Sequence, residues 1–115
     1  MPQFERVLRL RNRWLVEEMR LRALLTQERF EEVRVGTEAA LAVVTPLGWR
    51  ALEWRLRAVR AQALAALGDR GDAAVENRAA TGILRAMAQT LDPPRRAGFL
   101  AQPQAAALLA ARELS

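Results

Sequence analysis

The sequence predicts an all-α protein made of antiparallel helical hairpins, and three observations support this fold class. Apolar residues recur every three or four positions, as on one face of a helix, and no segment shows the alternation of a strand. Thr45-Pro46 and Gly68-Asp69 interrupt the helical pattern, as residues at helix ends do. A shift of 40 residues superposes Trp14 on Trp54, which indicates two hairpins of similar layout.

The first hairpin is predicted over residues 2–44. Its first helix should begin at Pro2, because proline suits a first helical turn, and should end at Leu25. Thr26 is placed to cap the second helix. Gly36 lies inside that second helix, where it either permits two helices to approach closely or stands by chance. An apolar stripe along the first helix is expected to pack on the second helix, and it contains Val7, Leu10, Trp14, Leu21 and Leu24.

The second hairpin is predicted over residues 46–91. Thr45 should cap a helix that starts at Pro46, because proline disfavours helix at the residue before it and suits a first turn. That helix should run to Leu67 and end at Gly68 in a left-handed conformation.

The last part of the chain is predicted to cover the second hairpin. Asp69 is placed to cap the hairpin's second helix, which should stop before Asp92-Pro93-Pro94. Short helices from Pro93 to about residue 101 and from Pro103 to about residue 113 then form a C-terminal cap over 93–113. At 115 residues the chain is predicted to be a single domain.

The composition argues against catalysis. The chain contains no histidine, lysine, tyrosine or cysteine, so it lacks the usual general base, Schiff-base amine, phenol and thiolate. Zinc and haem sites depend on histidine or cysteine ligands, so we expect no metal and no cofactor. Glu17-Glu18 and Glu31-Glu32 are interpreted as ion-pair partners instead of metal ligands. We therefore expect a protein that is not an enzyme, with catalysis by carboxylates alone as the remote alternative.

All 18 basic residues are arginines, and they outnumber the 13 acidic residues to give a formal charge of +5. The absence of lysine and the abundance of alanine indicate the codon bias of a GC-rich bacterial genome. The alternative is a nucleic-acid surface on the arginine face of the first helix, formed by Arg6, Arg9, Arg13 and Arg20. No secretory signal and no apolar run of about 20 residues occurs, so a cytoplasmic protein without membrane association is expected.

Several segments resemble tetratricopeptide repeats. Residues 28–33, followed by Ala40-Leu41, look like the turn and second helix of one repeat. The same pattern is found in the second hairpin at Ala61, Leu64, Gly68-Asp69, Ala73 and Ala80. Residues 84–109 are similar to the final segment of large bacterial regulators that join a nucleotide-binding module to a tetratricopeptide array. The chain departs from the family in its period of 40, where 34 is usual, and in Asn77, where an aromatic residue is preferred.

The resemblance implies a scaffold for protein–protein interaction or self-association in bacterial regulation, with a protein, a peptide or a second copy of the chain as partner. In the family the first helix of each hairpin lines the peptide groove. Carried over by position, this indicates Glu18, Arg22, Arg55 and Gln62, whose arginines could hold a carboxylate through forked hydrogen bonds. The alternative is that these residues are solvated surface. Trp49 is the tryptophan predicted to meet a partner, because it lies off its helix's main stripe.

Overall fold

The computed structural model of the chain describes residues 3–114, with side chains described for residues 3–111. These residues form six helices and no strand, which confirms the predicted all-α class. None of the described helices has the length and apolar character needed to cross a bilayer. The helices are α1 (Gln3–Thr26), α2 (Phe30–Val44), α3 (Arg50–Ala66), α4 (Arg70–Gln89), α5 (Pro93–Leu100) and α6 (Pro103–Leu114).

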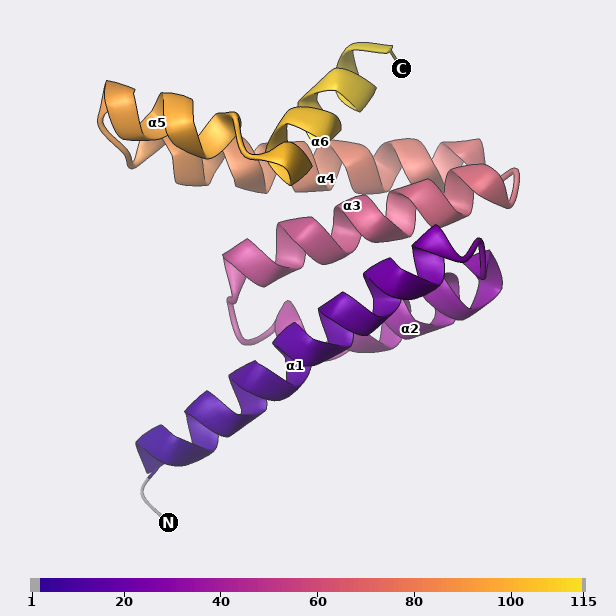
Figure 1. Ribbon diagram of the computed structural model, residues 1–115, viewed down its shortest axis with the longest axis horizontal. Helices are drawn as coiled ribbons and strands as arrows, with labels where there is room; N and C mark the ends of the chain where they lie inside the picture. The colour runs from indigo at the N-terminus through magenta and orange to yellow at the C-terminus, as the bar shows by residue number, and fades with distance from the viewer. Residues whose placement is uncertain (1–2, 115) are drawn as a thin grey trace.

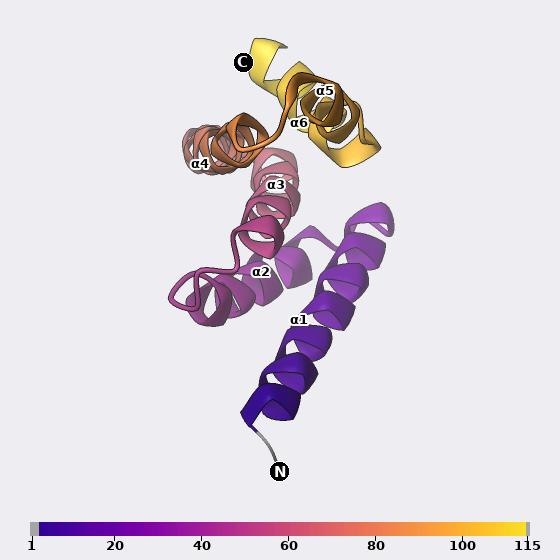
Figure 2. The same cartoon turned by 90° about the vertical axis from the view of Figure 1, so that its left-hand side faces the viewer.

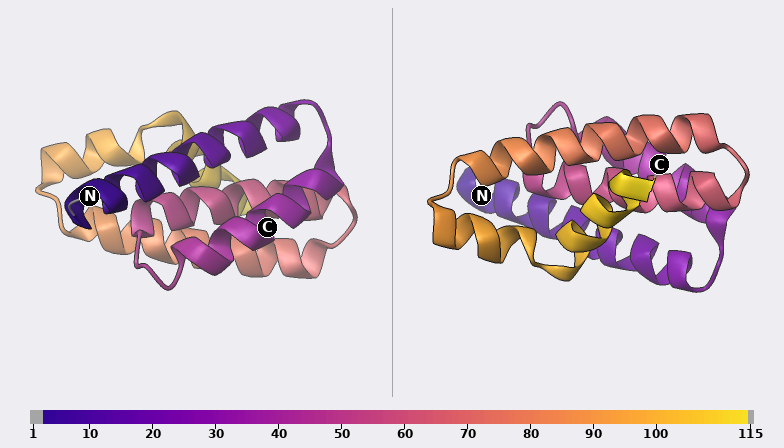
Figure 3. Two further views of the ribbon diagram at one scale, coloured as in Figure 1. Left: turned by 90° about the horizontal axis from the view of Figure 1, so that it is seen from below. Right: turned by 90° about the horizontal axis from the view of Figure 1, so that it is seen from above.

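Consecutive helices pack against each other, and α3 lies at the centre. Figure 1 shows α1 beside α2 and α3 beside α4, each pair running in opposite directions. Helix α3 contacts α1, α2 and α4, while α5 and α6 pack on α4 and on each other. Figures 2 and 3 show α1 on one side of the molecule and the C-terminal helices on the opposite side of α3.

The connection between α1 and α2 differs from the predicted one. Helix α1 continues through Thr26, whose hydroxyl donates to the carbonyl oxygen of Arg22 at 3.1 Å. The N-cap residue of α2 is Arg29, and no side chain caps this helix. The expectation for Thr26 was wrong because a threonine hydroxyl in the last turn of a helix can bond to the carbonyl four residues back.

The start of α3 also differs, because Gly48 takes a left-handed backbone conformation with φ +71°. A helix cannot pass through such a residue, so α3 begins at Arg50 instead of Pro46. Thr45 is the C-cap of α2, with its N–H donating to Leu41 O, and does not cap α3. The end of α3 was predicted correctly, since Gly68 follows it with φ +90°.

The predicted cap of α4 is confirmed. The side chain of Asp69 accepts a hydrogen bond from the backbone N–H of Asp72 at 3.4 Å, and α4 begins at Arg70. Helix α4 ends at Gln89, and α5 starts at Pro93 after the expected break.

The turns that follow α1 and α3 share one hydrogen-bond pattern, 40 residues apart. In each turn the second and third residues after the helix donate to carbonyl oxygens of its last turn, in the pairs Glu28–Leu25, Arg29–Leu24, Gly68–Ala65 and Asp69–Leu64 at 2.9 to 3.0 Å. This is a Schellman motif, which places one residue in the left-handed region. That residue is Glu28 in the first turn, with φ +61°, and Gly68 in the second. The register predicted from the tryptophans therefore recurs in the backbone.

Replacing Glu28 with glycine should raise the free energy of unfolding by about 0.5–1 kcal/mol. A residue with a side chain is strained by about 1–2 kcal/mol in the left-handed conformation, and the greater freedom of glycine in the unfolded chain offsets part of the gain. The matched change Gly68→Ala should lower it by about 1 kcal/mol, although no atom lies near the added Cβ. Urea unfolding followed by circular dichroism measures both. A lower midpoint for Glu28→Gly would contradict the strain at this turn.

The core consists of two clusters that share α3. The first lies between α1, α2 and α3, and the second between α3, α4 and α6 with Trp54 inside it. Trp14 packs against the first cluster, as expected. A Cβ at Gly36 would overlap the fully buried side chain of Leu21, so the close-approach interpretation of Gly36 is confirmed. Small residues at such crossings allow two helix backbones to come close.

The first part of α1 has no neighbour in the described chain. Every residue from 3 to 13 is exposed, and we call this segment the overhang. The predicted stripe packs on the rest of the protein from Trp14 onward, but the expectation was wrong for Val7 and Leu10. The reason is length. Helix α1 has 24 residues and α2 has 15, which makes α1 about 14 Å longer.

A network of charged side chains joins α2, α3 and α4. Arg57 of α3 donates to Glu53 at 2.9 Å and to Glu76 of α4 at 3.0 Å. One turn further along α3, Arg60 donates to the carbonyl oxygen of Arg34 in α2 at 2.6 Å. The carboxylate of Glu53 is almost fully buried, so this network is part of the interior and not a surface ornament of the helices.

Candidate functional site

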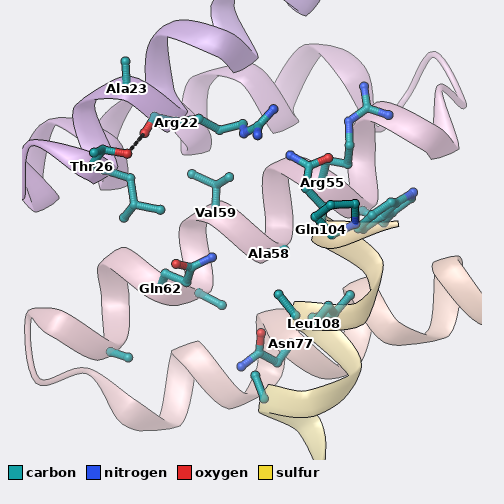
Figure 4. Close-up of a pocket in the computed structure, with 17 residues that line it drawn as sticks. Arg22, Ala23, Thr26, Arg55, Ala58, Val59, Gln62, Asn77, Gln104 and Leu108 are labelled. Atoms are coloured by element: carbon teal, nitrogen blue, oxygen red, sulfur yellow. Dashed lines mark hydrogen bonds between the residues drawn. The ribbon is translucent and has the colours of Figure 1, made fainter. Parts of the chain in front are cut away.

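A groove with a volume of about 730 Å³ opens between α1, α3 and α6. Figure 4 shows its walls: α1 on one side, α3 across the floor and α6 on the other side. We call this cavity the groove. It exists because α6 crosses α3 and α4 at a distance from α1, so that only side chains reach across the space between them. The first helices of the two pairs, α1 and α3, therefore both face the groove.

The groove is largely apolar and is lined by small side chains. Five alanines leave its walls shallow, namely Ala23, Ala58, Ala65, Ala107 and Ala111. Larger apolar residues, Leu25, Val59 and Leu108, complete the lining. Such a surface can receive bulky apolar side chains from another molecule, because the alanines leave room that the chain itself does not fill.

Arg22 is the cation at the mouth of the groove. Its side chain extends from α1 toward Gln104 of α6 (Figure 4). With the Gln104 amide oriented to satisfy both groups, its oxygen accepts from the three guanidinium nitrogens of Arg22 at 2.9 to 3.1 Å. No carboxylate among the described side chains pairs with Arg22. An amide leaves the positive charge unneutralised, so Arg22 can still attract an anion.

Arg55 lies across the groove from Arg22 but is already paired. Its Nε and Nη2 atoms donate to the two carboxylate oxygens of Glu18 at 2.7 and 2.9 Å. Glu18 is only 4% exposed, and this forked pair connects α1 to α3. The sequence predicted both residues as contacts for a partner. The structure places Arg55 in the groove wall and buries Glu18 behind it, where its carboxylate is taken up by Arg55.

Three further polar groups line the groove without a hydrogen-bond partner among the described residues. They are the side-chain amides of Gln62 and Asn77 and the indole N–H of Trp54, which is buried. The groove thus combines an apolar surface with donors and acceptors that are free to bind a ligand. Sequence reasoning indicated Gln62, but it missed Trp54, Asn77 and Gln104. The departure of Asn77 from the family pattern was the one available signal, because a polar residue where an aromatic is usual is a sign of a different environment.

Trp49 lies apart from the groove. It is the N-cap residue of α3 and packs, half-buried, against the first core cluster. The structure therefore brings Arg22, Arg55 and Gln62 together, places Glu18 behind Arg55, and leaves Trp49 outside this group. Any contact of Trp49 with a partner would involve a different surface.

The paired glutamates are ion-pair partners, as the sequence predicted. Their arginine partners give the pairs Glu17–Arg20, Glu18–Arg55, Glu31–Arg34 and Glu32–Arg29. The bond to Arg34 lowers the pKa of the Glu31 carboxyl below its ordinary value. Within the side chains described, no three acidic residues come together in a way that could hold a metal ion.

Comparison with known proteins leaves the chain without relatives. No protein-family model, no curated protein and no solved structure matches it.

Proposed function

We propose that the chain is a protein–protein interaction module of the tetratricopeptide-like kind, and that its groove holds an acidic segment of a partner protein. One observation carries this proposal. Arg22 is placed at the edge of an apolar groove with a neutral amide, not a carboxylate, as its partner among the described side chains. A guanidinium in that setting binds a carboxylate through forked hydrogen bonds.

The lining residues specify the chemistry of the bound segment. A carboxylate of the segment would bind Arg22, while the amides of Gln62 and Asn77 could bond to its peptide groups. Bulky apolar side chains of the segment would lie against the alanines and Leu108. Arg55 would contribute little charge, because Glu18 neutralises it. The segment is therefore expected to be both acidic and apolar.

Binding is favoured over catalysis by the side chains that the groove offers. Its lining contains arginine, asparagine, glutamine, threonine and apolar residues but no carboxylate. Proton transfer near neutral pH requires a group that titrates there, and the chain has no histidine, cysteine, lysine or tyrosine. A role in bacterial regulation and a cytoplasmic location follow from the family resemblance and the composition, and both belong to this proposal.

Binding of nucleic acid is the second candidate. In its favour, Arg6, Arg9 and Arg13 are exposed on the overhang and have no ion-pair partner among the described residues. Against it, Phe4 and Leu8 are exposed among these arginines, and phosphate groups would leave such side chains uncovered. A protein partner accounts for both kinds of residue.

Selection of peptides from a random displayed library against the immobilised chain tests the groove. We expect the enriched peptides to combine Asp or Glu with Leu, Ile or Phe. Binding of a synthetic copy of an enriched peptide should weaken about tenfold in Arg22→Glu, because a charged hydrogen-bonded contact is lost. The control Arg78→Glu changes the net charge equally at an exposed position of α4 outside the groove lining.

The two variants separate groove binding from general charge attraction. Arg78→Glu should alter the affinity by less than about twofold, since screening weakens a distant surface charge. Equal losses in both variants would overturn the proposal, as would a selection without enrichment of acidic peptides. Chemical shifts that change on α1, α3 and α6 during titration of the peptide would support it.

A further inference from the structure

The overhang presents apolar side chains that nothing in the described chain covers. Phe4 is 73% exposed, Val7 46%, Leu8 42% and Leu10 37%. Val7 and Leu10 continue the stripe that, from Trp14 onward, packs on the rest of the protein. A contiguous apolar strip on a helix indicates a surface that is covered by a binding partner.

The charge of the overhang constrains that partner. Arg6, Arg9, Arg11 and Arg13 face a single acid, Glu5, within this segment. None of these arginines forms an ion pair with a described residue. The surface that covers the overhang must therefore be acidic, and it must have room for the bulky side chains of the stripe.

One surface of this same chain meets both requirements. The side of α2 that points away from the core is exposed and carries acidic and small residues, namely Glu31, Val35, Glu38, Ala39 and Ala42. We call it the α2 outer face. Its glutamates complement the arginines of the overhang, and its two alanines leave space for leucine and phenylalanine side chains.

The corresponding face of α4 lacks these features. Under the 40-residue shift, Val35 corresponds to Val75, and the two valines are 52% and 51% exposed. Glu31 and Glu38, however, correspond to Gly71 and Arg78. The face of α4 thus has the same central valine but no negative charge, so it does not complement the overhang.

We propose that two copies of the chain pair around a twofold axis, with the overhang of each copy lying on the α2 outer face of the other. The stripe of the overhang points toward the side on which its own α2 lies. A partner's α2, placed beyond the end of that helix, continues the same seam. The twofold rotation then brings the partner's overhang onto the first copy's α2 outer face, so both surfaces are covered in one arrangement.

Reciprocity also supplies enough contact. A standard interface takes about 800 Å² and about 20–30 residues from each partner. The overhang, residues 3–13, is too short to provide this alone. In the reciprocal dimer each copy contributes both an overhang and an α2 outer face, which doubles the contact. The inference is independent of the groove, since no residue of the overhang or of the α2 outer face lines it.

Sedimentation equilibrium of the full chain tests this dimer. The wild-type chain should be a dimer, and Leu10→Glu and Val35→Glu should each weaken it about a hundredfold. Each contact should weaken about tenfold and occurs twice in the dimer. The control Val75→Glu places the same charge at the corresponding valine of α4 and should leave the dimer intact. Circular dichroism should show equal helix content in all four proteins, because these side chains are exposed in the single chain.

Mixing the two weakened variants provides the sharper test. In a mixture, the overhang of Val35→Glu and the α2 outer face of Leu10→Glu are both unaltered, so one intact contact forms. The mixture should therefore associate at concentrations where each variant alone is monomeric. A monomeric wild-type chain would overturn the proposal, as would a Val35→Glu dimer of wild-type affinity. Retention of duplex DNA by a monomeric wild-type chain, lost on replacing Arg6, Arg9 and Arg13 with Gln, would instead assign the overhang to nucleic acid.

Discussion

Replacing Arg57 with methionine should lower the free energy of unfolding by about 3 kcal/mol. The guanidinium donates to Glu53 at 2.9 Å and to Glu76 at 3.0 Å, and both carboxylates are largely buried. Burial lowers the pKa of Arg57, but its bonds to these two glutamates outweigh that effect and hold the pKa above its ordinary value. Methionine keeps most of the packing and leaves two buried negative charges without a cation. Because Arg57 retains 22% exposure, we expect the lower end of the range for such changes.

Urea unfolding, followed by tryptophan fluorescence, measures this loss. The control is Arg29→Met, which removes an arginine that pairs with Glu32 where both side chains are about half exposed. It should cost less than about 0.5 kcal/mol, because exposed ion pairs contribute little. Adding Glu53→Gln and Glu76→Gln to Arg57→Met should restore part of the stability, since the uncompensated charges are then gone. If Arg57→Met costs no more than Arg29→Met, the network does not stabilise the fold.

Breaking the pair between Glu18 and Arg55 should have the second-largest effect, and the effect should be asymmetric. Arg55→Met leaves the Glu18 carboxylate buried without a cation and should cost about 2–4 kcal/mol. Glu18→Gln should cost only about 1–2 kcal/mol, because the amide oxygen can still accept one bond and Arg55 is more exposed than Glu18. In each case the change acts between α1 and α3, which this pair connects.

A double-mutant cycle tests the coupling between the two residues. The double variant Glu18→Met with Arg55→Met should be more stable than Arg55→Met alone, since it no longer contains a buried charge. Hydrogen exchange should accelerate in the second half of α1 for Arg55→Met and much less elsewhere. Additive losses, with no coupling energy, would show that the pair does not hold α1 on α3.

Helix content and most helix ends could be predicted because their causes are local. The spacing of apolar residues produced α1 to α6 with small errors, and Gly68 and Asp69 end one helix and start the next as expected. The errors at Thr26 and Thr45 have a common source. A threonine next to a helix end can bond back into the helix before it or cap the one after it, and only the backbone of the following residues decides which. Gly48 made that decision for Thr45.

The candidate site could be predicted only in part. The repeat register placed Arg22, Arg55 and Gln62 on one side of the first helices, and all three line the groove. The opposite wall comes from α6, whose path across α3 and α4 is not encoded in any short pattern. Gln104 therefore remained unrecognised, and the pairing of Glu18 with Arg55, 37 residues apart, could not be distinguished from two solvated charges.

The sequence by itself determined that this protein is helical, where its turns lie, that its turns repeat after 40 residues, and that it lacks the side chains on which most enzymes depend. Each of these follows from residue types and spacings of a few positions. Only the tertiary structure decided which charges are buried, which arginine keeps its charge free, and that the overhang passes the end of α2. Those outcomes depend on how helices of unequal length pack together, and packing is set by contacts between residues far apart in the chain.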